Sequence, residues 1–147
     1  MKVTKAELNE FTFLLGECLR YCQQVEHDVQ MILALLQEGD KHSNLNNIKD
    51  NRLTLGNTIH EIGEIDKESD RPFFSQNDYK VLYTITGERN HFVHQSFNEF
   101  LYRQGEEAKA HFEKEKERLL RFHTNMKAVS EAACKARLIA AKRVYGK

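Results

Sequence analysis

The chain has few of the residues that interrupt helices. Its 147 residues include one proline, Pro72, and seven glycines. Proline and glycine are the strongest local helix breakers, so long helices meet little obstruction here. No segment shows the two-residue alternation of apolar and polar residues that marks a half-buried strand. The sequence therefore predicts an all-α protein.

Net charge and long apolar runs are missing as well. Lys plus Arg and Asp plus Glu both number 22, so global charge favours neither nucleic acid nor a membrane surface. No apolar run approaches the length of a membrane span. The N-terminal stretch "MKVTKAELNEF" lacks the apolar core of a signal peptide. We therefore predict a cytoplasmic protein with no membrane partner.

Cysteine is scarce, and several catalytic motifs are absent. Cys18 and Cys22 lie one helical turn apart in an apolar stripe, while Cys134 is distant, which predicts three buried, reduced thiols. A zinc site would need more ligands at closer spacing. The chain has no glycine-rich phosphate loop, no G-x-S-x-G and no helix-turn-helix signature. Sequence-specific DNA binding is therefore unsupported.

Apolar residues at steps of three and four predict the helices. The first begins after a T-x-x-E capping box at Thr4 and Glu7 and ends near Gly39. Residues 39–51 are polar and predict a loop, residues 53–65 a short helix, and residues 66–74 a second connection.

Two further helical segments complete the chain. A helix capped by Ser75 or Asn77 is expected to continue past Gly87 to about Tyr102. Residues 104–144 keep the helical rhythm and form either one very long helix or two joined by a bend.

These segments predict one domain, residues 1–147, folded as an antiparallel bundle of about four main helices. The first and last helices are longer than the second. A second subunit would cover their overhang, so we expect a homodimer.

The stretch "GERNHFVHQSF" carries the candidate chemistry. An arginine followed after four to six residues by a histidine is weak evidence alone, because the chain contains three such pairs, including Arg118 with His123. The pair Arg89 and His94 adds Asn90 directly after the arginine and an apolar Val93 directly before the histidine.

Through this R-N-x-x-x-H motif the chain resembles the HEPN superfamily of all-α domains, many of which are metal-independent ribonucleases. The position two after the histidine is Ser96, where one HEPN subgroup has tyrosine. The resemblance implies a motif at a dimer interface and a role such as a toxin, phage defence or RNA processing. A toxin would have a separate antitoxin chain as partner.

The residue types suit RNA cleavage without a cofactor. Histidine serves as general base or acid near neutral pH, and arginine is a permanent cation that binds phosphate through two donors. We therefore name Arg89, Asn90 and His94 as catalytic candidates. Asn90 would orient a phosphate oxygen or the imidazole. The auxiliary candidates are Glu88, His91 and Ser96.

Helix geometry constrains this site. Asn90 and His94 are four residues apart and share a face, whereas Arg89 and His94 are five apart, about 140° around a regular helix. Either the helix bends within the motif, near Gly87, or a second subunit completes the site. We predict a composite site with two copies of Arg89, Asn90 and His94.

Two other interpretations stay open. One is a non-catalytic helical module that binds RNA, a nucleotide or a protein through the same face. The other, weaker one is a metal-binding bundle using His60, His91 and a carboxylate of the first helix. Glu88 and His91 have the E-x-x-H spacing of di-iron bundles, but the sequence has no second E-x-x-H.

Overall fold

A computed structural model describes residues 2–146 and is all-helical, with no strand in that range. Its elements are α1 (Lys5–Leu36), α2 (Lys41–Asp50), α3 (Leu55–Lys67), α4 (Gln76–His94), α5 (Asn98–Leu101) and α6 (Gly105–Tyr145). The predicted all-α class and the long first and last helices are confirmed. None of the helices among the described residues is both long and apolar enough to cross a membrane.

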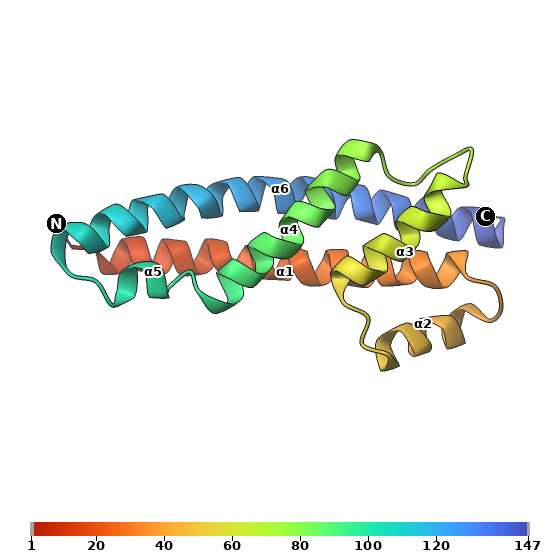
Figure 1. Cartoon of the computed structure of the whole chain (residues 1–147), viewed down its shortest axis with the longest axis horizontal. Helices are drawn as coiled ribbons and strands as arrows, with labels where there is room; N and C mark the ends of the chain where they lie inside the picture. Colours follow the sequence, from red (N-terminus) through yellow and green to blue (C-terminus); the bar gives the residue numbers. More distant parts are fainter. Residues whose placement is uncertain (1, 147) are drawn as a thin grey trace.

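Helices α1 and α6 form the long axis of the molecule and run in the same direction (Figure 1). Near their N-terminal ends Glu7 pairs with Lys109, and further along Cys22 Sγ lies 3.8 Å from Met126 Sδ. Contacts that advance together along both chains define a parallel pair. Helix α4 crosses this pair in the opposite direction, and α2 and α3 lie near the C-terminal half of α1 (Figure 1).

The predicted loop at residues 39–51 is wrong, because most of it forms α2. Asp40 caps this helix through a 2.9 Å hydrogen bond that its carboxylate accepts from the backbone N–H of Ser43. Ile48 is buried, and the Asn44 side chain donates to carbonyls at the end of α1. The polar composition concealed the two apolar residues, Leu45 and Ile48, and the cap that hold this short helix.

The extra helix explains why the direction of the long pair differs from the prediction. In an alternating bundle of four helices, the first and last run antiparallel. Here α2 adds one more reversal between α1 and α3, so α3 follows the direction of α1, α4 opposes it, and α6 follows it again (Figure 1).

The predicted helix to about Tyr102 is also wrong at its C-terminal end. Ser75 caps α4 in a capping box, but the helix ends at His94. Beyond it, the backbone N–H groups of both Gln95 and Ser96 donate to the carbonyl of His91. The buried Ser96 side chain then faces α6, and the chain continues into the short α5. The last segment, by contrast, is one continuous helix, α6.

Aromatic packing closes the N-terminal end of the molecule. The ring of Phe11 on α1 lies 5.3 to 5.8 Å, centre to centre, from those of Phe97, Phe100 and Phe112. These contacts join α1, α6 and the segment after α4 into one apolar cluster. They hold the segment after α4 against α1 and α6.

The cysteines follow the prediction in part. Cys18 and Cys22 are buried and unpaired, and burial raises the pKa of their thiols to about 12 and about 11. Cys134 is unpaired too, but it is only partly buried, which differs from the prediction.

The connection between α3 and α4 is organised by the buried carboxylate of Asp66. It accepts hydrogen bonds from the backbone N–H groups of Phe73 and Phe74 and from the Tyr79 hydroxyl, the last at 2.5 Å. We expect Tyr79→Phe to lower the free energy of unfolding by about 1.5–3 kcal/mol, the contribution of a hydrogen bond to a charged group. Urea denaturation measures this change.

Tyr83→Phe is the matched control, because Tyr83 lies one turn further along α4 and is half exposed. It should leave the urea midpoint unchanged. Equal midpoints for both variants would show that the Asp66 contact contributes nothing to stability.

Candidate functional site: a polar hollow between α4 and α6

A shallow polar hollow lies where α4 crosses α6. Helix α4 and the residue after it supply most of its lining, and α6 supplies an arginine. The lining residues are Gly87, Asn90, His91, His94, Gln95 and Arg118. All of these except Arg118 belong to the stretch predicted to carry the chemistry.

Helix α4 runs unbroken through the motif. Gly87 lies inside it, and the helix ends only at His94. No helix therefore starts or breaks near Gly87. Asn90 and His94 are exposed and one turn apart on the same face, as the spacing predicts.

Arg89 points to a different neighbour. Its Nη2 lies 3.6 Å from Glu26 Oε2 on α1, and it does not line the hollow. About a third of its side chain, 36%, is exposed. One subunit thus brings Asn90 and His94 together and directs Arg89 elsewhere.

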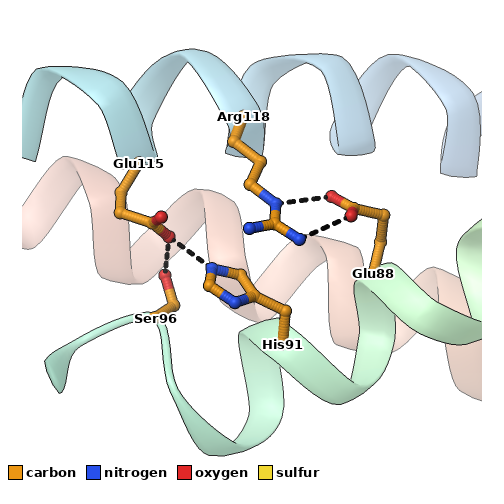
Figure 2. Close-up of polar contacts among 5 residues, drawn as sticks. All are labelled: Glu88, His91, Ser96, Glu115 and Arg118. Carbon is orange, nitrogen blue, oxygen red and sulfur yellow. Dashed lines mark hydrogen bonds and ion pairs between the residues drawn. The ribbon is translucent and has the colours of Figure 1, made fainter. Parts of the chain in front are cut away.

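A polar group that includes His91 of the hollow joins α4 and the segment after it to α6 (Figure 2). The Glu115 carboxylate on α6 is 2.7 Å from His91 Nε2 and accepts a 2.9 Å hydrogen bond from Ser96 Oγ. The side chains of His91 and Glu115 are each 10% exposed. An ionised carboxylate only accepts hydrogen bonds, so Nε2 carries a proton and the ring orientation is fixed.

Glu88 and Arg118 form a two-pronged ion pair beside it (Figure 2). Arg118 Nε donates to Glu88 Oε2 at 2.9 Å, and Nη2 donates to Oε1 at 2.7 Å. These hydrogen bonds lower the pKa of the Glu88 carboxyl and raise that of Arg118. The three auxiliary candidates, Glu88, His91 and Ser96, therefore all bond to α6.

The lowered pKa of Glu88 makes its contribution to stability pH-dependent. A carboxyl whose pKa is depressed by folding stabilises the protein above its unfolded value of about 4.3 and loses that effect as pH falls through the folded value. We expect Glu88→Gln to destabilise the protein at pH 7 by on the order of 1 kcal/mol. The difference from wild type should shrink towards pH 3 in urea titrations.

Glu117→Gln is the control, because Glu117 is exposed on α6 and close in sequence to Arg118. It should match wild type across this range. A Glu88→Gln difference that stays constant from pH 7 to pH 3 would contradict the assigned ion pair.

Metal ligands do not gather in the described part of the chain. Within residues 2–146 there is no group of three or more His, Cys, Asp or Glu side chains that could hold a metal ion. His60, one of the ligands in the metal-binding interpretation, is exposed on α3. That interpretation has no ligand set in this range.

Sequence reasoning missed Glu115 and Arg118. The sequence analysis considered Arg118 only for its spacing from His123. Arg118 nevertheless lines the hollow, whereas His123 Nε2 lies 3.1 Å from Glu17 Oε1 on α1. One signal was available, since Glu115 and Arg118 are three apart and share a helix face. Their partners on α4 follow only from the way the helices cross.

No protein-family model, curated protein sequence or solved structure matches the chain. Its function is therefore inferred from the residues of the hollow and from the motif to which two of them, Asn90 and His94, belong. Those residues offer two imidazoles, two amides and a guanidinium on one open surface. Such a set can transfer protons and bind an anion.

Proposed function

We propose that the chain is a HEPN-like, metal-independent endoribonuclease that acts as a homodimer. One observation carries this proposal: Asn90 and His94 lie exposed on one face of a continuous helix, in a hollow that also holds an arginine. The resemblance of the R-N-x-x-x-H motif to that of the HEPN superfamily indicates RNA as the substrate. A toxin, phage-defence or RNA-processing role belongs to the same proposal.

The reaction requires only side chains. One His94 imidazole takes the proton from an RNA 2′-hydroxyl, whose oxygen attacks the adjacent phosphorus. The bond from phosphorus to the 5′-oxygen breaks, and a second imidazole protonates that oxygen. The products are a 2′,3′-cyclic phosphate and a 5′-hydroxyl, while Arg89 stabilises the negative charge that develops on phosphorus.

The direction of Arg89 supports a site shared between two subunits. In one subunit Arg89 faces Glu26 on α1, away from the hollow that holds His94. Across a dimer, Arg89 of one copy can meet His94 of the other, and two His94 side chains supply both base and acid. Val93, apolar and half exposed beside His94, suits such an interface.

Mixing wild type with an inactive variant tests the shared site. His94→Ala protein is mixed with wild type under conditions that exchange subunits, and RNA cleavage is assayed in EDTA. A site that needs His94 from both copies is lost in every mixed dimer, so activity should fall with the square of the wild-type fraction. Activity that falls in direct proportion to the wild-type fraction would show sites contained within single subunits and would overturn the shared site.

A non-catalytic binding module is the second candidate. The observation that favours it is that Arg89 and Arg118 both already pair with carboxylates, which reduces the positive charge available to a transition state. Such a module would bind RNA, a nucleotide or a protein through the same hollow. Wild-type protein that binds single-stranded RNA in EDTA and leaves it intact would favour this candidate over the nuclease.

A further inference from the structure

His91 and Arg118 meet in the hollow from two different helices, and a glutamate holds each of them. His91 of α4 is bound by Glu115 of α6, and Arg118 of α6 is bound by Glu88 of α4 (Figure 2). In one pair the glutamate belongs to α6, and in the other pair it belongs to α4. Each glutamate fixes one edge of its partner and leaves the other edge free.

The free edges are accessible. Nη1–H of Arg118 is a donor, whereas Nδ1 of His91, in a ring whose Nε2–H is bound to Glu115, donates only when the ring is protonated. Among residues 2–146, neither Nδ1 of His91 nor Nη1 of Arg118 has a hydrogen-bond partner, and neither atom is buried. Both side chains line the hollow, next to the exposed Asn90 and His94. Arg118 also lies over the buried Phe92 ring, 5.9 Å from its centre, which further limits its motion.

We propose that His91 and Arg118 form a binding subsite for one phosphate group of a single-stranded nucleic acid within one subunit, with Glu115 and Glu88 as positioning residues. The subsite rests on the proposed function only for its ligand, an RNA phosphate. It adds to the shared site a contact that each subunit makes by itself. Arg89 and His94 then act on the scissile phosphate, and this subsite holds the strand.

Local charge sets the condition for binding. The charged groups near this pair come from three helices: Glu88 of α4, Glu99 of α5, and Glu115, Arg118 and Arg121 of α6, with His94 of α4 beside them. A proton on His91 adds a donor at Nδ1 and one positive charge, and both favour a bound phosphate.

A DNA oligonucleotide separates binding from cleavage, because it lacks the 2′-hydroxyl that the nuclease reaction needs. The affinity of a single-stranded DNA 12-mer is measured by fluorescence anisotropy at several salt concentrations. The compared proteins are wild type, Glu88→Gln, and Glu88→Gln combined with Arg118→Met. The double variant removes both charges together and so leaves no unpaired charge at α6.

Glu88→Gln is the reference for the double variant, because the two proteins differ only at Arg118 and the glutamine oxygen can still accept from Arg118. The double variant should bind about tenfold more weakly than Glu88→Gln, the effect of one charged hydrogen bond. Its plot of log affinity against log salt should lose about 0.7 of slope, as for one phosphate contact on a single strand. Arg20→Met, at an exposed arginine of α1, is the control and should change affinity little.

A direct readout follows the His91 ring. In long-range ¹H–¹⁵N spectra, the Nδ1 signal of His91 should move when the oligonucleotide is added, and His91→Gln should weaken binding where His111→Gln does not. Equal affinities for Glu88→Gln and the double variant, an unmoved Nδ1 signal, or no binding by wild type would each overturn the subsite. Wild type that binds DNA as expected but leaves RNA intact would instead refute the nuclease and keep the subsite.

Discussion

Replacing His94 with alanine should reduce RNA cleavage by at least about 100-fold, the usual contribution of a positioned acid or base. His94 is exposed at the C-terminal end of α4 and lines the hollow, so its loss removes an imidazole without opening a cavity in the core. The free energy of unfolding should therefore stay within about 0.5 kcal/mol of wild type. The measurement is the single-turnover cleavage rate in EDTA.

His60→Ala is the matched control, because His60 is another exposed histidine on a helix, α3. Its cleavage rate should equal that of wild type. If His94→Ala cleaves RNA as fast as His60→Ala, His94 is not a catalytic residue.

Replacing Phe11 with alanine should lower the free energy of unfolding by about 3–5 kcal/mol, the range for truncating a buried phenylalanine. Phe11 is 1% exposed and contacts three other rings, from α6 and from the segment after α4. Its loss would leave a cavity between α1 and α6 that rigid helices close poorly. Urea denaturation followed by circular dichroism measures the change.

Phe13→Ala is the control on the same helix. Phe13 is 67% exposed, so the same substitution there should shift the free energy of unfolding by less than about 0.5 kcal/mol. Comparable losses for the two variants would contradict the assigned packing of α1 against α6.

Much of the helical content was predictable because it depends on local pattern. The Thr4 cap and the apolar stripe located α1, and Ser75 marked the start of α4. Helix α2 escaped prediction because a cap at Asp40 and one buried isoleucine, Ile48, give little periodic signal. The end of α4 escaped because Ser96 is drawn to Glu115, a contact across helices.

The candidate site also has a part that was predictable from the sequence and a part that was not. The shared face of Asn90 and His94 follows from their spacing on one helix, and so does the divergence of Arg89. The partners Glu115 and Arg118 depend on the register between α4 and α6. Helix α4 packs on the parallel pair of α1 and α6. That pair is parallel because α2 adds a reversal of the chain, and the sequence did not predict α2.

The most direct measurement of the central claim is an analysis of RNA product ends. Mixed-sequence RNA is incubated in EDTA with wild-type and His94→Ala protein, and both ends of the fragments are identified. Metal-independent cleavage by the α4 motif predicts fragments with 2′,3′-cyclic phosphates and 5′-hydroxyls from wild type and intact RNA from His94→Ala. Intact RNA with wild type, or the same fragments from both proteins, would contradict it.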